Sequence, residues 1–244
     1  MKRTGGSDEA KRRAGERAAE EVEDGFVVGL GTGSTTAHAI RAIGEMVEGG
    51  LEIQGIPTSF QSRQLALEVG IPLTSLDAIS SVDLAIDGAD RVVDTGDGDE
   101  QVLDRSDAGD GDLIKGGGAA HMREKLVDTA ADRFVVVADP SKLADRLGGP
   151  IPLEVVPDAH SAVADTVQEL EGEPTLREAE HKDGPVVTDN GNLVLDCSFG
   201  PIEDPERLAS RLASIPGVLE HGLFVGRTDA TYIGTETGVE VREY

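Results

Sequence analysis

The sequence has few cysteines, aromatic residues and lysines. Cys197 is the single cysteine among 244 residues, so the chain cannot form an internal disulfide and a reducing compartment is expected. Aromatic residues make up 3% of the chain and tryptophan is absent, so the core has to be built from Val, Leu, Ile and Ala. Only six of the 22 basic residues are lysines, at positions 2, 11, 115, 125, 142 and 182.

The sequence also lacks long apolar runs and an excess of positive charge. No stretch approaches 18 apolar residues and no apolar segment follows residues 1–3, so we expect neither a membrane span nor a signal peptide, and a cytoplasmic location. The net charge of −25 argues against nucleic acid and anionic membranes as partners. Acidic, lysine-poor composition is typical of cytoplasmic proteins from salt-accumulating halophiles, and an acidic mesophilic enzyme is the alternative.

Residues 26–48 have the pattern of a strand, a glycine loop and a helix. The loop, GLGTGST at 29–35, fails the dinucleotide fingerprint G-x-G-x-x-G because Ser34 stands where the last glycine is needed. It also lacks the lysine of a phosphate-binding P-loop. Thr32, Gly33, Ser34 and Thr35 offer N–H and hydroxyl donors at the start of a helix, which suits one phosphate group. A nucleotide site and a purely structural turn remain alternatives.

The segment LIKGGGAAHMREK, residues 113–125, predicts a second unit of the same kind. Three glycines at 116–118 let backbone N–H groups approach a ligand, and the following helix directs its N-terminal dipole at the turn. Lys115 precedes the glycines, and Glu124 is expected about two turns into the helix. The pattern predicts an anion site with a cation and a base beside it, and an ordinary turn with surface charges is the alternative.

A third group of polar residues follows the apolar run 82–86. The motif DGAD, from Asp87 to Asp90, falls at the carboxyl end of a predicted strand, where open α/β sheets bind ligands. A turn in which Asp caps its own backbone is the alternative. Residues 95–112 are acidic and glycine-rich but lack the calcium-loop spacing, and the five histidines share no metal-ligand spacing, so no metal is expected.

The remaining pattern predicts an α/β protein with a second, α+β part. Helices are expected over 7–24, 58–69, 161–171 and 204–214. Strands are expected over 51–56, 72–75, 134–138, 152–156, 217–224, 231–234 and 239–242, with a hairpin of 185–188 and 192–196. The order after residue 148 is that of a split βαβ unit. We therefore expect one domain over 1–147, completed by 225–244, and a smaller one over 148–224.

In order along the chain, GLGTGST, DGAD, KGGGAA with Glu124-Lys125, Ser141-Lys142, VVTDNGN and IPGVLEHGLF together resemble ribose-5-phosphate isomerases of the A type. The resemblance covers nearly the whole chain. It implies a Rossmann-like domain that carries the site, and a ferredoxin-like α+β lid domain that helps to form a homodimer or homotetramer. It further implies reversible isomerisation of ribose 5-phosphate and ribulose 5-phosphate with no cofactor or metal.

The resemblance also assigns residues. Glu124 matches the catalytic base, and Lys115, Asp87 and Asp90 match the polar groups around the reacting carbons. The resemblance places substrate contacts at Lys11, Thr32, Gly33, Ser34, Thr35, Asp87, Gly88, Ala89, Asp90, Lys115, Gly116, Gly117, Gly118 and Lys142. Arg91 departs from the family, which usually has Glu after DGAD, and the excursion 95–112 is longer than usual.

Such a reaction moves a proton between adjacent carbons through an enediolate. A carboxylate base and a fixed cation suit it, which are the roles matched to Glu124 and Lys115. Two other functions fit the same resemblance less well. A sugar-phosphate sensor would need a DNA-binding module, for which no segment is apparent, and an acyl-CoA transferase would use the glutamate as a nucleophile.

Overall fold

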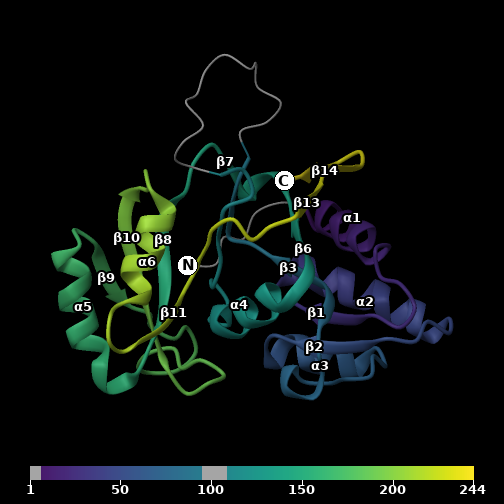
Figure 1. The fold of residues 1–244 in the computed structure, drawn as a ribbon, viewed down its shortest axis with the longest axis horizontal. Coiled ribbons are helices and arrows are strands. Elements are labelled where there is room, and N and C mark those ends of the chain that lie inside the picture. Colours follow the sequence, from purple (N-terminus) through teal and green to yellow (C-terminus); the bar gives the residue numbers. More distant parts are fainter. Residues whose placement is uncertain (1–6, 95–108) are drawn as a thin grey trace, which may run out of the picture. The chain divides into compact units, whose positions relative to one another are not determined.

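The computed structural model describes residues 7–94 and 109–244 (Figure 1). They form two compact units, which are described separately. The Rossmann-like unit comprises residues 7–89, 123–143 and 227–244, and the α+β unit comprises residues 90–94, 109–122 and 144–226. This division differs from the expected domain limits because residues 90–94 and 109–122 belong with the α+β unit. No helix of the described ranges is both long and apolar enough to cross a membrane.

The Rossmann-like unit contains a six-stranded sheet with the order β14-β13-β6-β3-β1-β2. The strands are β1 (Val27–Leu30), β2 (Gln54–Pro57), β3 (Val82–Gly88), β6 (Ala131–Ala138), β13 (Ala230–Gly234) and β14 (Val239–Glu243). All are parallel except β14, which pairs antiparallel with β13 at the edge. The strand order reverses between β1 and β3, which is where a sheet of this type binds ligands at its carboxyl ends.

Helices cover both faces of this sheet. They are α1 (Asp8–Ala19), α2 (Ser34–Glu48), α3 (Phe60–Glu68) and α4 (His121–Ala130). Side chains of α1 and α2 pack in one core with Val28 and Leu30 of β1. Val127 of α4 packs so close to Gly29 that a Cβ there would lie 2.6 Å from its Cγ1. Because successive strand residues face opposite sides, α4 covers the face opposite α1 and α2.

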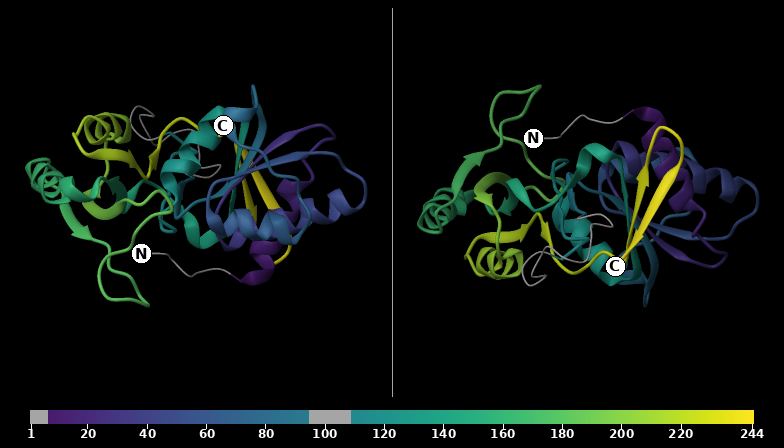
Figure 2. Two further views of the ribbon diagram at one scale, coloured as in Figure 1. Left: turned by 90° about the horizontal axis from the view of Figure 1, so that it is seen from below. Right: turned by 90° about the horizontal axis from the view of Figure 1, so that it is seen from above.

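Several expected boundaries in this unit are wrong. Ser7 caps α1 as predicted, accepting a hydrogen bond from the N–H of Ala10, but the helix ends at Ala19 instead of residue 24. The residues after it are largely acidic, and negative charge opposes the dipole at a helix C-terminus. The strand expected over 72–75 contributes only an isolated bridge between Leu73 and Gly55. The expected closing strands near the C-terminus are confirmed, and Figure 2 shows their hairpin beside α1.

The α+β unit has the split βαβ order that the sequence predicts. Its main sheet runs β11-β8-β10-β9 and its described pairs are all antiparallel. The elements are β8 (Gly148–Val155), α5 (His160–Glu169), β9 (Glu173–Leu176), β10 (Leu193–Pro201), α6 (Pro205–Ala213) and β11 (Val218–His221). Val163 and Val167 of α5 and Leu212 of α6 pack with the sheet, so both helices close one core.

The predicted hairpin of 185–188 and 192–196 is wrong in its first strand. Residues 185–188 contribute only two isolated bridges, Pro185 with Glu178 and Val187 with Leu193, and β10 pairs instead with β8 and β9. The turn between them is built around Glu154 of β8, whose carboxylate is fully buried. Its Oε1 accepts hydrogen bonds from Thr188 (2.9 Å), Asn190 (3.0 Å) and Asn192 (2.8 Å).

A smaller sheet has the order β12-β5-β4-β7. Its strands are β4 (Arg91–Val93), β5 (Leu113–Ile114), β7 (Leu143–Ala144) and β12 (Leu223–Phe224). The strand expected over 217–224 is therefore divided at Gly222 into β11 and β12, which belong to different sheets. Short 3₁₀ helices lie at Leu76–Ala78, Pro140–Lys142 and Pro157–Ala159. Most of the acidic excursion, residues 95–108, lies outside the described residues.

Candidate active site

In the Rossmann-like unit, the loop after β1 leaves the start of α2 open to an anion. Gly33 is the N-cap and makes no side-chain cap hydrogen bond. Its φ of 131° and ψ of 175° lie in a region that is essentially restricted to glycine. A helix start without a side-chain cap presents backbone N–H groups and the positive end of the dipole. Ser34 is exposed and Thr35 is nearly buried at this position.

Two residues that the sequence analysis did not single out, Thr58 and Ser59, contact this loop. The hydroxyl of Thr32 lies 2.9 Å from that of Thr58 and donates to Ser59 Oγ at 2.7 Å. Thr58 and Ser59 follow β2, the strand beside β1, and Ser59 also caps α3. The hydroxyl cluster therefore joins the ends of two neighbouring strands. The only sequence signal was that these two hydroxyl residues open the helix predicted over 58–69, just after the strand predicted over 51–56.

Asp87 supports the same loop from β3. Its side chain is fully buried, and its Oδ1 accepts the N–H of Thr32 at 2.9 Å and of Gly88 at 2.6 Å. A Cβ at Gly31 would lie 2.2 Å from this carboxylate, so only glycine permits the contact. The hydrogen bond from Gly88 is the local turn in which an Asp caps its own backbone, the alternative given for this motif. The hydrogen bond from Thr32 shows that the same carboxylate also contacts the loop after β1. Asp87 fixes the backbone of the expected phosphate loop.

Glu124 and two of the expected lysines also lie in this unit. Glu124 is in the first turn of α4, not two turns into it as predicted, because the glycine turn extends to Ala120 before the helix begins at His121. The residue is 3% exposed. Lys142 is also buried, in the 3₁₀ helix that follows β6, and Asp139 caps this helix by accepting the N–H of Ser141.

Lys11 lies on α1, one turn before the point where α1 approaches α2. There a Cβ added at Gly15 would lie 2.9 Å from the carbonyl oxygen of Thr35. Lys11 itself is half-buried. Residues four apart share a helix face, so Lys11 and Gly15 are on the side of α1 that faces the start of α2.

In the α+β unit, Lys115 carries a positive charge into a nearly water-free environment. It is 1% exposed, and its Nζ lies 5.4 Å from the ring centroid of Phe224, a cation–π arrangement. Its N–H donates to the carbonyl of Gly222 at 2.8 Å. A Cβ at Gly222 would lie 2.2 Å from the Lys115 carbonyl oxygen, so this glycine is required for the close pairing. The backbone on both sides of the lysine is therefore tightly held.

The glycine turn after Lys115 is shaped by Asp90. Asp90 Oδ2 accepts the N–H of Gly117 at 2.6 Å, so this donor is already used within the protein. Gly116 has a φ of 101° and packs against the ring of His121, where a Cβ would lie 2.7 Å from Nδ1. The N–H of Ala119 donates to the Gly116 carbonyl and closes the turn. Gly118 is the exposed member of the three.

The structure thus distributes the expected residues over both units. Lys11, Thr32–Thr35, Asp87, Gly88, Ala89, Glu124 and Lys142 belong to the Rossmann-like unit, and Asp90, Lys115 and Gly116–Gly118 belong to the α+β unit. Asp87 accepts a hydrogen bond from the backbone of the loop after β1, at Thr32, and Asp90 accepts one from the glycine turn, at Gly117. Among the residues that the structure describes, no group of three or more metal-ligating side chains could hold an ion.

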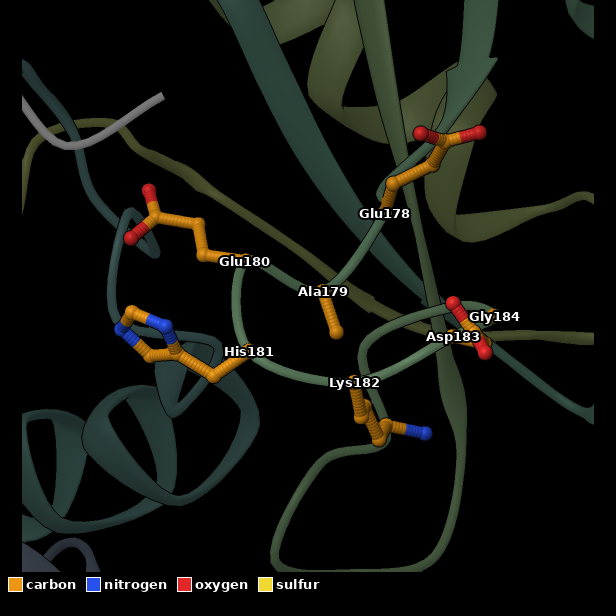
Figure 3. Close-up of a pocket in the computed structure, with 7 residues that line it drawn as sticks. All are labelled: Glu178, Ala179, Glu180, His181, Lys182, Asp183 and Gly184. Atoms are coloured by element: carbon orange, nitrogen blue, oxygen red, sulfur yellow. The ribbon is translucent and has the colours of Figure 1, made fainter.

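A hollow of about 730 Å³ lies elsewhere, along residues 178–184 of the α+β unit. Figure 3 shows its lining side chains pointing in different directions: Glu180 and His181 project to one side, while Lys182 projects away from them. None of the expected site residues lines it. A loop whose polar groups diverge has no convergent set of donors for a ligand, so we do not assign a site there.

The fold and these residues describe an α/β protein without a dinucleotide fingerprint. It has an uncapped helix start of the kind that suits a phosphate-sized anion, and it buries one glutamate and one lysine of the expected site. The family model for ribose 5-phosphate isomerase A (phosphoriboisomerase A) matches residues 54–238. The chain belongs to this family.

Curated relatives match over nearly their full length. Ribose-5-phosphate isomerase A of Haloarcula marismortui is 63% identical, covering 98% of this chain and 97% of the relative. That of Halorubrum lacusprofundi is 61% identical over 99% of each chain. The solved ribose 5-phosphate isomerase A of Methanocaldococcus jannaschii has a TM-score of 0.88 at 41% identity, covering 98% of this chain and 100% of that one. Another solved isomerase, in complex with phospho-erythronic acid, has a TM-score of 0.89 at 39% identity, with 98% and 100% covered.

Proposed function

We propose that this chain interconverts D-ribose 5-phosphate and D-ribulose 5-phosphate, as a cytoplasmic enzyme of the non-oxidative pentose phosphate pathway. Family membership and the names of its relatives support this assignment. The observation that carries the chemistry is the burial of Glu124 in the first turn of a helix that follows Lys115 and the glycine turn. A non-catalytic sugar-phosphate sensor would not require a carboxylate and an amine with almost no exposure.

In the proposed reaction, Glu124 takes the proton from C2 of the open-chain aldose and returns it to C1. The electrons of the broken C–H bond form the C1–C2 double bond of the enediolate, and negative charge develops on oxygen. Lys115 stabilises this charge, and its low exposure strengthens the interaction because little water screens it. Protonation of C1 and transfer of the remaining hydroxyl proton complete the ketose.

The other residues bind and orient. Ser34, Thr35 and the N–H groups at the start of α2 hold the phosphate, with Lys11 and Lys142 as further cations. Asp87 and Asp90 keep the two loops in place through Thr32 and Gly117. Gly88, Ala89, Gly116 and Gly118 offer backbone contacts to the sugar. The free energy of phosphate binding is used to position the reacting carbons.

Replacement of Glu124 by Gln tests this proposal. The amide cannot accept the proton, so kcat should fall by about 10² to 10⁴, the scale of a positioned general base. Ketose formation from ribose 5-phosphate is followed in the presence of EDTA, since no metal is expected. Glu154→Gln is the matched control, because Glu154 is equally buried but lies on β8. Wild-type protein without isomerase activity would reject the function, and a Glu124→Gln variant keeping a third of wild-type kcat would reject the base.

We also propose that the chain forms a homodimer or homotetramer. Val156 and Leu219 of the α+β unit are 41% and 40% exposed, although their neighbours Val155 and Val218 pack into the core. Apolar side chains exposed at the end of β8 and on β11 suit a contact with a second copy. Light scattering coupled to size exclusion measures the mass directly, and a mass near 25.5 kDa at micromolar concentration would contradict the proposal.

A further inference from the structure

Arg177 makes contacts that neither the motifs nor the family assignment explains. It directly follows β9, and its side chain is 12% exposed. Its Nε and Nη2 bind the two carboxylate oxygens of Asp196 on β10 at 2.8 and 2.5 Å. This fork-to-carboxylate pairing fixes the plane of the guanidinium.

The third nitrogen of the Arg177 guanidinium reaches the glycine turn. Nη1 donates to the carbonyl of Gly116 at 2.9 Å and to that of Gly117 at 3.3 Å. All of these residues belong to the α+β unit. A guanidinium can serve a carboxylate and two carbonyls at once because its N–H groups diverge in one plane, which an ammonium cannot reproduce.

These bonds determine where the N–H groups of the turn point. The described residues contain no cis peptide bond, and in a trans peptide the C=O and N–H point in opposite directions. The peptide between Gly116 and Gly117 is held at its oxygen by Arg177 and at its nitrogen by Asp90. The next peptide directs its oxygen at Arg177, so the N–H of Gly118 points away from Arg177.

The turn needs such restraint because its residues have no side chains. Glycine has more accessible backbone conformations than any other residue, so an unrestrained three-glycine turn would sample many orientations of its peptide groups. A donor stabilises developing charge well only if it is oriented before the reaction. Arg177 restricts the carbonyl side of the turn, while Asp90 restricts the other side.

We propose that Arg177 is a positioning residue for the isomerisation: it holds the Gly116 and Gly117 carbonyls so that the exposed Gly118 N–H and the adjacent Lys115 are kept oriented towards the anion at the reacting end of the sugar. This inference rests on the proposed isomerase function. Arg177 acts through the peptide groups and touches no substrate.

The kinetic test is Arg177→Lys, which keeps the charge and loses the fork. We expect kcat to fall by about 10-fold to 100-fold, the scale of a small misplacement, while KM changes by less than about threefold. The matched control is Arg133→Lys in the Rossmann-like unit, because Arg133 also binds two carboxylates, those of Glu21 and Glu243. It should retain wild-type kcat. Unchanged kcat in Arg177→Lys, or an equal loss in both variants, would overturn the proposal.

A binding measurement separates this inference from the proposed function. Phospho-erythronic acid carries a carboxylate, which resembles an enediolate in having two oxygens on planar carbon and a negative charge. By titration calorimetry, Arg177→Lys should weaken its affinity by at least about tenfold and leave that for inorganic phosphate unchanged. This difference between the two affinities can be measured without turnover. A wild-type protein without isomerase activity would therefore reject the proposed function but leave the binding test of Arg177 intact. Equal weakening of both ligands, or of neither, would reject the role of Arg177.

Asp196→Asn keeps the test valid if Arg177→Lys does not fold. It retains Arg177 but replaces one of the two carboxylate oxygens by a donor, which releases half of the fork. The same preferential loss of phospho-erythronic acid affinity is expected, to a smaller degree. A folded Asp196→Asn variant that binds both ligands as the wild type does, with unchanged kcat, would contradict the inference.

Discussion

At the scale of single residues, the proposed mechanism assigns different tasks to Lys115 and to the loop after β1, and their burial differs accordingly. Lys115 is 1% exposed beside the ring of Phe224, where a charge on a ligand is poorly screened. Ser34 is exposed at a helix start, where we propose that the phosphate binds, and the phosphate charge is present throughout the reaction. An interaction that strengthens only in the transition state changes kcat, whereas one made equally with substrate changes KM.

We therefore expect Lys115→Ala to lower kcat by about 10² to 10³ with a smaller change in KM. The double change Ser34→Ala and Thr35→Val should mainly raise KM. Lys182→Ala, in the exposed loop 178–184, is the control for loss of a lysine and should leave both constants unchanged. Steady-state kinetics with ribose 5-phosphate measure both constants, and equal effects on KM alone would refute this division of roles.

Cys197 is expected to be inert in the folded protein. It lies fully buried on β10, and burial, followed by the negative charge of Asp196, raises the pKa of its thiol to about 12. Only about one thiol in 10⁴ is then ionised at pH 8, and the thiolate is the reactive form. Iodoacetamide at pH 8 should modify the native chain slowly and the denaturant-unfolded chain rapidly. Complete labelling of the native protein within minutes would contradict this environment.

The sequence pointed to candidate site residues through motifs, and it did not show contacts that depend on tertiary geometry. Lys115, Asp87 and Glu124 stand beside glycine turns or at strand ends, so their types and positions indicated a site. Arg177 lies in a polar segment without a motif, and its contact with Asp196 arises from the pairing of β9 with β10. The hydrogen bond from the Gly117 N–H to Asp90 is also a tertiary contact that no motif shows.

At the scale of elements, helices and buried strands have a strong hydrophobic pattern and were predicted well. Short strands with a weak pattern were predicted poorly. β1, β3, β6 and β13 are apolar runs in a parallel sheet, which the sequence shows clearly. β9 (Glu173–Leu176) contains glutamate and proline, so its sequence gave no strand signal. The segment 185–188 is apolar but is held by the turn around Glu154 and contributes no strand.

Asp112 links two elements and predicts a pH effect on stability. It lies just before β5, and its Oδ1 accepts the N–H of Gly226, which follows β12. Burial, as the largest cause, raises the pKa of its carboxyl above the unfolded value of 3.8. The folded state therefore favours the protonated acid, so the contribution of this group to stability is present below about pH 4 and is lost as pH rises through the folded pKa.

Asp112→Asn removes this ionisation while keeping an oxygen that can accept from Gly226. The difference in the free energy of unfolding, variant minus wild type, should increase from about pH 4 upward and then level off. Asp77→Asn is the control, because a hydrogen bond from Ser75 lowers the pKa of the exposed Asp77 carboxyl. For Asp77→Asn, the difference in the free energy of unfolding, variant minus wild type, should be small and should decrease as pH rises. Urea unfolding at several pH values gives both differences, and one that falls for Asp112→Asn would contradict the argument.

At the scale of the whole molecule, the main feature is the net charge of −25. The described ion pairs use arginine to offset part of this charge. Arg12 binds Glu9 and Glu16 within α1, and Arg133 joins Glu21 to Glu243 of β14. Such exposed ion pairs stabilise a fold only weakly. In dilute buffer, the acidic side chains that exceed the basic ones in number repel one another. The relatives from Haloarcula and Halorubrum are proteins of halophilic archaea, which fits an acidic composition selected in concentrated salt.

We therefore predict that molar salt improves both stability and catalysis. At about 1 M salt the Debye length falls to roughly 3 Å, so repulsion within the acidic surface, and between that surface and an anionic sugar phosphate, is largely screened. The charge of Lys115 is buried and acts at short range, so it is screened much less. In a KCl titration from about 0.05 to 3 M, the helix signal in far-UV circular dichroism and kcat/KM should rise together. An enzyme that steers its anionic substrate by a positive field would instead lose kcat/KM with each addition of salt. A constant helix signal with a rate that falls throughout the range would therefore reject adaptation to salt, while leaving the isomerase assignment intact.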